Sequence, residues 1–164
     1  MFVIAQTKQM DCWATASAIL ASWKELQLVP TDKFVSRLNE KFRILYDTDA
    51  GLPAADQPDL MSQTGMRQEA PQNYTVDGWL SLLKSFGPLM VTTALPDPDD
   101  DWAIHIRVVS AIKGDGTPDG TKLHVIDPDG AHESDMTVTA FAKEMENIAK
   151  ADGVGDIRPM VIHF

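Results

Sequence analysis

The stretch QTKQMDCWATAS, residues 6–17, holds the only cysteine of the 164-residue chain, Cys12. Apolar residues beyond it recur at helical spacing, namely Trp13, Ala16, Ile19, Leu20, Trp23 and Leu26. Asp11 is suited to cap such a helix and Pro30 to end it. The pattern predicts a buried helix that begins at Cys12, where the partial positive charge of the helix amino terminus favours a thiolate.

Further helices are expected before residue 90. An amphipathic helix from Thr31 and Asp32 would bury Phe34, Val35, Leu38 and Phe42 on one face. Residues 47–75 are rich in Asp, Gln, Pro and Gly without a lasting period, which predicts a long surface excursion with a short helix at most. Another helix is predicted over 76–86, ending at Gly87-Pro88.

The pattern then changes to that of strands. These are predicted at LMVTTAL (89–95), IHIRVVSAIK (104–113), KLHVID (122–127) and IRPMVIHF (157–164), with one more helix near 138–150. Helices first and strands afterwards predict an α+β fold in which amino-terminal helices pack on an antiparallel sheet. A hydrophobic content of 44% over this length fits one domain spanning 1–164.

Charge and composition exclude several function classes. With 14 basic and 24 acidic residues the net charge is −10, which argues against binding to nucleic acid or to an anionic membrane surface. No signal peptide and no run of about 18 apolar residues is visible, so we expect a soluble protein. A single cysteine allows no internal disulfide and suits a reducing compartment such as the cytoplasm. No His/Cys cluster has metal-ligand spacing, and no cofactor is expected.

A histidine and a carboxylate are predicted to meet on two neighbouring strands. The turn-rich segment GDGTPDGT (114–121) indicates a hairpin, and His105 and Asp127 are equally far from Gly116 within it. His105 could then form an ion pair with the thiolate of Cys12 and act as acid and base, while Asp127 orients the ring. The simpler alternatives are a half-exposed strand histidine and an Asp-Pro turn.

Attack by the thiolate on an amide would generate an oxyanion that needs donors at close range. The backbone N–H of Cys12 and a side-chain amide from the segment before it would serve, and both Gln6 and Gln9 are candidates.

These residues together resemble a known family. The run Gln6-x5-Cys12-Trp13 followed by small residues, then HIRVVSAIKGDG (105–116) and VIDPDG (125–130), is similar to papain-like cysteine peptidases of the smaller bacterial branches. Those branches include peptidases that remove double-glycine leaders and short effector proteases. The resemblance implies a papain-like fold, with Cys12 as nucleophile, His105 as acid and base, Asp127 as orienting residue and Gln6 in the oxyanion hole. Residues 30–88 match nothing in particular.

The expected function is that of a cysteine peptidase that cleaves a protein or peptide through an acyl-enzyme at Cys12. The resemblance further suggests a bacterial toxin or effector used in competition, delivered into a target cell by a specialised secretion system and opposed by a cognate inhibitor or immunity protein. It also suggests a preference for Gly-Gly sites.

The side chains of Trp13 and Trp102 would bind substrate by narrowing the cleft. The acidic run 96–102 is expected to be a solvated loop or, alternatively, a rim that attracts basic substrates.

Two other function classes remain open at this point. The same triad could serve a peptidoglycan amidase, a glutamine deamidase or a transglutaminase, because fold analogy does not separate these reactions. A non-catalytic binding module of the same fold is the third alternative.

Overall fold

The computed structural model describes residues 1–95, 103–150 and 160–164. Its α-helices are α1 (Cys12–Glu25), α2 (Thr31–Val35), α3 (Glu40–Asp47), α4 (Gln57–Thr64), α5 (Val76–Phe86) and α6 (Val138–Glu146). Short 3-10 helices are η1 (Ala54–Asp56), η2 (Asp129–Ala131) and η3 (Asn147–Lys150). The strands are β1 (Arg67–Gln68), β2 (Leu89–Leu95), β3 (Ala103–Gly114), β4 (Thr121–Asp127), β5 (His132–Thr137) and β6 (Val161–His163).

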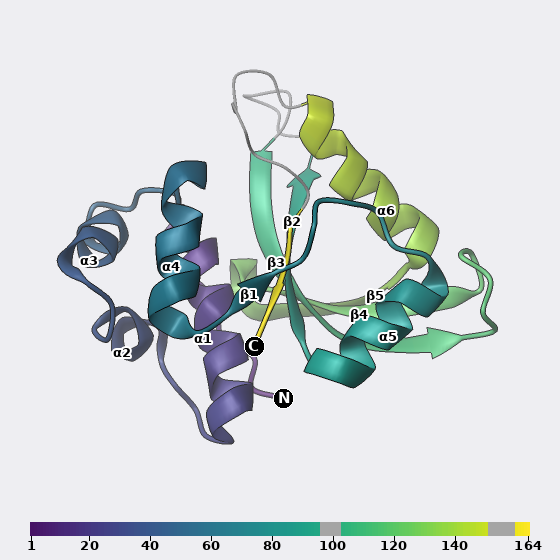
Figure 1. Ribbon diagram of the computed structural model, residues 1–164, viewed down its shortest axis with the longest axis horizontal. Coiled ribbons are helices and arrows are strands. Elements are labelled where there is room, and N and C mark those ends of the chain that lie inside the picture. The colour runs from purple at the N-terminus through teal and green to yellow at the C-terminus, as the bar shows by residue number, and fades with distance from the viewer. Residues whose placement is uncertain (96–102, 151–159) are drawn as a thin grey trace.

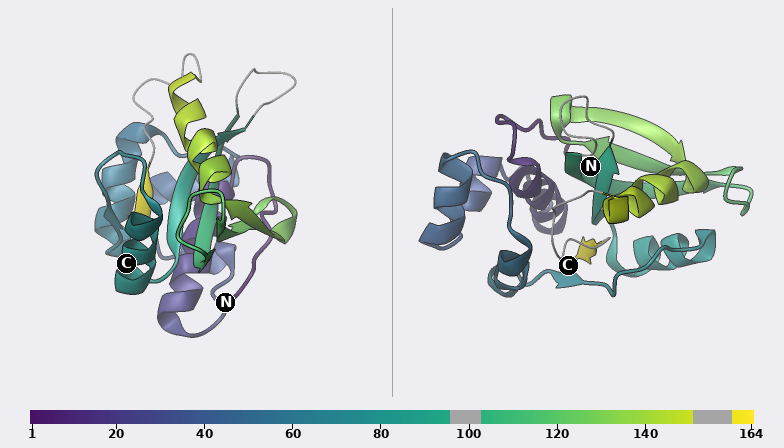
Figure 2. Two further views of the ribbon diagram at one scale, coloured as in Figure 1. Left: turned by 90° about the vertical axis from the view of Figure 1, so that its right-hand side faces the viewer. Right: turned by 90° about the horizontal axis from the view of Figure 1, so that it is seen from above.

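The strands form one curved sheet with helices on both sides. The sheet order is β1-β6-β2-β3-β4-β5, and the pairings are antiparallel. Helices α1 to α4 gather on one side of the sheet and α5 and α6 on the other (Figure 1). The view from above shows the same separation (Figure 2, right). The predicted α+β architecture, with amino-terminal helices packed on an antiparallel sheet, is confirmed.

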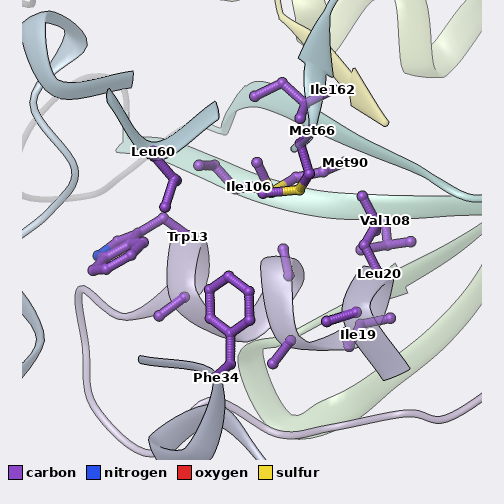
Figure 3. Close-up of a cluster of buried hydrophobic side chains, with 14 of the residues drawn as sticks. Trp13, Ile19, Leu20, Phe34, Leu60, Met66, Met90, Ile106, Val108 and Ile162 are labelled. Atoms are coloured by element: carbon purple, nitrogen blue, oxygen red, sulfur yellow. The ribbon is translucent and has the colours of Figure 1, made fainter. Parts of the chain in front are cut away.

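Two hydrophobic clusters fill the two sides because successive strand residues point to opposite faces. On β3, Val108 packs with the α1 cluster and Val109 with the cluster under α5 and α6. Figure 3 shows the α1 side, where Trp13, Ile19 and Leu20 of the helix meet Ile106 and Val108 of the sheet. This packing presses α1 against the middle of the sheet, so the start of the helix is held in a fixed place.

Helix α1 begins at Cys12 as predicted, but two details of the prediction are wrong. Asp11 occupies the capping position without a side-chain capping hydrogen bond. Leu26 is 86% exposed and adopts a left-handed conformation that ends the helix, four residues before Pro30. The helical spacing of apolar residues thus runs one position past the end of the helix, and the side chain of Leu26 lies outside the core.

The helix expected after Thr31 is two helices, α2 and α3. Asn39 separates them, and its side chain accepts a hydrogen bond from the backbone N–H of Phe42. The predicted apolar face is nevertheless buried, with Phe34, Leu38 and Phe42 all in the core. The segment 47–75 includes α4, which inserts the fully buried Leu60, and β1, which pairs with β6.

The strands β2, β3 and β4 lie where they were predicted, to within a residue. β5, with the sequence HESDMT, was not predicted because its exposed side chains show no alternation of apolar and polar residues. Of the last predicted strand, 157–159 lie outside the described residues and Val161–His163 forms β6. Among the helices described here, none is long and apolar enough to cross a membrane.

Candidate active site

Cys12 is the first residue of α1 and a free thiol that is partly accessible to solvent. The next residue, Trp13, is fully buried and fixes the first turn of the helix through its packing against Phe42. The sequence thus places a small reactive side chain at the helix amino terminus and a large anchoring one directly behind it. A thiolate at this position interacts favourably with the helix dipole.

His105 on β3 and Asp127 on β4 are in direct contact. The Nε2 atom of His105 lies 2.6 Å from Oδ1 of Asp127, and the same carboxylate oxygen accepts a hydrogen bond from the backbone N–H of Asp129 at 2.9 Å. Their side chains are 14% and 24% exposed. The predicted pairing of a histidine with a carboxylate across the hairpin is therefore present.

The observed register of the hairpin differs from the predicted one, in which the turn was centred on Gly116. Val108 faces Ile126 and Gly114 faces Thr121, with a bulge between Val109 and Ala111. His105 and Asp127 consequently meet diagonally across the two strands, which is still within reach of a histidine side chain.

The charge state of the pair favours an imidazolium. Burial is the largest single influence and lowers the pKa of His105, but the hydrogen bonds and charges of Asp127 and Cys12 outweigh it and raise the pKa to about 9. Burial raises the pKa of Asp127, and the hydrogen bond and charge of His105 more than reverse this, so the net shift is downward. Because Nε2 is engaged by Asp127, Nδ1 is the ring nitrogen left to face the thiol.

The loop before Cys12 is tied to the strand that carries Asp127. The backbone N–H of Gln6 donates to the carbonyl of Pro128 at 2.7 Å. The Nε2 of the same glutamine donates to the carbonyls of Lys8 and Gln9, at 3.1 and 3.3 Å. Its Oε1 is buried and has no hydrogen-bond partner among the described residues. Gln9 is exposed, so Gln6 is the better enclosed of the two glutamine candidates.

Asp11 stabilises this loop through side-chain hydrogen bonds that the sequence did not predict. It is only 1% exposed, and its Oδ2 accepts hydrogen bonds from both the N–H and the hydroxyl of Thr7, each at 3.2 Å. The sequence predicts Asp11 as a helix cap, and the spacing of four residues from Thr7 is the only signal for the contact that the structure shows.

Of the two tryptophans expected to bind substrate, Trp13 is contradicted by its burial and Trp102 remains a prediction. The indole of Trp13 is 0% exposed and donates to the carbonyl of Ala50, so it belongs to the core and is not available to a substrate. Its apolar spacing along the helix already indicated burial. Trp102 and the acidic run 96–102 lie outside the described residues.

Two of the remaining histidines, His124 and His163, have side-chain partners. His124 lies between Glu133 and Asp135, with both ring nitrogens 3.0 Å from a carboxylate oxygen. His163 is buried, lies 2.9 Å from Glu69 and stacks on Phe86. His132 is the first residue of β5. Across the described ranges, no cluster of three or more His, Cys, Asp or Glu side chains is arranged to hold a metal ion.

The α+β arrangement, with a cysteine at the mouth of the first helix and a His–Asp pair on the adjoining sheet, is that of a papain-like cysteine peptidase. The chain belongs to the family of the papain-like cysteine protease AvrRpt2, whose family model matches residues 2–146. It is accordingly a cysteine-type peptidase, a hydrolase that acts on protein. A comparison with curated proteins gave no match.

Proposed function

We propose that Cys12, His105 and Asp127 form the catalytic triad of this peptidase. The contact of 2.6 Å between Nε2 of His105 and Oδ1 of Asp127 carries the proposal, because it leaves Nδ1 free for the thiol and favours the protonated ring. The location of Cys12 at the start of α1, with its interactions with His105, supports its assignment as nucleophile.

The reaction would follow from these positions. The thiolate of Cys12 attacks the scissile carbonyl and forms a tetrahedral intermediate, and His105 donates its Nδ1 proton to the leaving amine as the C–N bond breaks. A water molecule then attacks the resulting thioester. His105 takes the proton of this water, and release of the carboxylic acid restores the thiolate and the imidazolium. Asp127 keeps the ring in place throughout through its hydrogen bond to Nε2.

For the oxyanion we propose the backbone N–H of Cys12 and the side-chain amide of Gln6. The position of Gln6 beside Pro128 and its enclosed side chain support this assignment. The Gln6 amide nitrogen carries two N–H donors, both directed at carbonyls of its own loop, so the role requires that one of them turn to the oxyanion while the other keeps the amide in place.

We further propose that the peptidase, as one domain over 1–164, acts as an effector or toxin in the reducing interior of a target cell, where a cognate inhibitor or immunity protein would oppose it. The free thiol is compatible with such a compartment. The Gly-Gly preference rests on the sequence resemblance alone, since Trp13 does not narrow the cleft.

Two measurements test the triad. The rate of alkylation of Cys12 by iodoacetamide is followed by intact mass from pH 5 to 9 for the wild type, Cys12→Ala and His105→Ala. A thiolate–imidazolium pair gives rapid labelling below pH 7 that is lost in His105→Ala. Labelling only above pH 8 in both the wild type and His105→Ala would refute the thiolate–imidazolium pair.

Digestion of a proteome-derived peptide library, with sequencing of the new ends, then identifies the cleaved bond. Cys12→Ala should cleave nothing while keeping the fold, because the change removes little packing. Large side chains on both sides of the cleaved bond would exclude a Gly-Gly preference.

A further inference from the structure

We infer that Asp49, in the turn after α3, is a positioning residue that fixes the loop from which the Gln6 amide of the proposed oxyanion hole projects. The inference rests on the proposed function of Cys12 and Gln6. It assigns a role in the reaction to the helical segment between 30 and 88, which the sequence alone did not connect to the site.

The carboxylate of Asp49 binds the backbone of the loop directly. Its Oδ1 accepts a hydrogen bond from the N–H of Met10 at 2.8 Å, and its Oδ2 accepts one from the N–H of Gln9 at 3.3 Å. Met10 is two residues from Cys12, so the carboxylate restrains the chain immediately before the nucleophile. Gln9 and Met10 belong to neither a helix nor a strand, so no regular backbone pairing satisfies their N–H groups. Asp49 supplies the acceptors that these groups require.

Asp49 makes these contacts from a strained, left-handed backbone conformation. Its φ angle is 55°, in the left-handed region that costs a residue with a Cβ atom on the order of 1 kcal/mol. A glycine would adopt this conformation without that cost. The conformation is thus accounted for by the two hydrogen bonds of the side chain, which glycine could not make.

Neighbours of Asp49 make two further contacts, one with the loop before Cys12 and one with the helix after it. The ammonium group of Lys8 donates to the carbonyl of Tyr46 and lies 4.0 Å from the centre of its ring. The indole N–H of Trp13 donates to the carbonyl of Ala50 at 3.3 Å. The turn from Tyr46 to Ala50 therefore contacts the catalytic segment on both sides of Cys12.

The restraint extends from this loop to the side chain of Gln6. The amide of Gln6 is bound by the carbonyls of Lys8 and Gln9, and the N–H of Gln9 is bound by Asp49. A loop released from Asp49 would displace the Gln6 amide, whereas the N–H of Cys12 stays with the packed first turn of α1. Release of the loop would leave the His105–Asp127 contact intact, because that contact is made within the β3–β4 hairpin.

Four variants separate positioning from folding. Asp49→Ala removes the acceptors and keeps the strain, whereas Asp49→Gly removes both. Asp49→Asn keeps one acceptor oxygen and tolerates the left-handed conformation. Asp47→Ala is the matched control, since Asp47 is exposed and has no hydrogen bond or ion pair with the described part of the chain. Thermal unfolding followed by circular dichroism reports the stability of each.

The deciding readouts are kcat and KM on a library peptide that the wild type cleaves, together with iodoacetamide alkylation of Cys12 at pH 6. Alkylation needs the thiolate but no oxyanion hole. We expect Asp49→Gly to keep wild-type stability and alkylation while kcat falls between about tenfold and a hundredfold and KM changes less than about threefold. Asp49→Asn should recover part of kcat, and Asp47→Ala should match the wild type.

A kcat for Asp49→Gly within about twofold of the wild type would overturn the inference. A parallel loss of alkylation would also overturn it, because the damage would then lie in the thiolate–imidazolium pair. If the wild type itself is neither alkylated at pH 6 nor active on the library, the proposed function fails, and that result is distinct from both.

Discussion

Replacing His105 with glutamine should remove much of the pH dependence of stability above pH 6. The pKa of His105 rises from 6.5 to about 9 in the folded protein, so the imidazolium stabilises the fold. For a raised pKa, this stabilisation is fully present below pH 6.5 and is lost as the pH rises through about 9. At about 1.4 kcal/mol per pKa unit the contribution is on the order of 3 kcal/mol. The side chain is only 14% exposed, so solvent screening is small.

The assay is urea unfolding, followed by tryptophan fluorescence, at about pH 6, 7.5 and 9.5 for the wild type and His105→Gln. The difference in unfolding free energy between the two proteins should shrink by on the order of 3 kcal/mol from the lowest to the highest pH. In Asp127→Asn the corresponding loss should occur at lower pH, because the hydrogen bond that raises the pKa of His105 is weakened. A wild-type minus His105→Gln difference that stays constant from pH 6 to 9.5 would refute the reasoning.

Three other sites give predictions that unfolding experiments can check. Gly87 has a φ of 77° and an added Cβ would lie 2.3 Å from the ring of Trp23, so Gly87→Ala should cost about 3 kcal/mol of unfolding free energy. Gly65 has a φ of 74° and open space around it, so Gly65→Ala should cost only about 1 kcal/mol of unfolding free energy. Equal losses of unfolding free energy in the two alanine variants would contradict the steric argument. Glu144→Ala leaves the 5% exposed Arg107 without its carboxylate and should cost about 3 kcal/mol, whereas an unchanged urea midpoint would show that the pair does not stabilise the fold.

The parts of the site that depend on local sequence could be predicted. The contact between His105 and Asp127 follows from a hairpin whose turn is rich in glycine and aspartate, and the two residues are only 22 positions apart. The register could not be predicted, because the bulge between Val109 and Ala111 involves no glycine or proline that would indicate it.

Contacts between distant loops could not be predicted. Asp49 binds backbone N–H groups about 40 positions earlier in the chain, and no periodic pattern of side chains encodes such a contact. The strand β5 escaped prediction for a related reason, since its polar residues form a strand only through pairing with β4. Trp13 shows the reverse error, because its place next to Cys12 suggested a role in the substrate cleft although the apolar spacing of its own helix indicated burial.

The two halves of the candidate triad have very different contact orders. His105 and Asp127 are joined within a single hairpin, a kind of structure that forms in microseconds. Cys12 has to reach His105 across roughly ninety residues, and closing so long a loop is slow. During synthesis from the amino terminus Cys12 emerges well before His105, so we expect the proposed Cys12–His105 pair to form only when α1 packs on β3. For the proposed triad, this difference in contact order would delay proteolytic activity until the chain is largely folded.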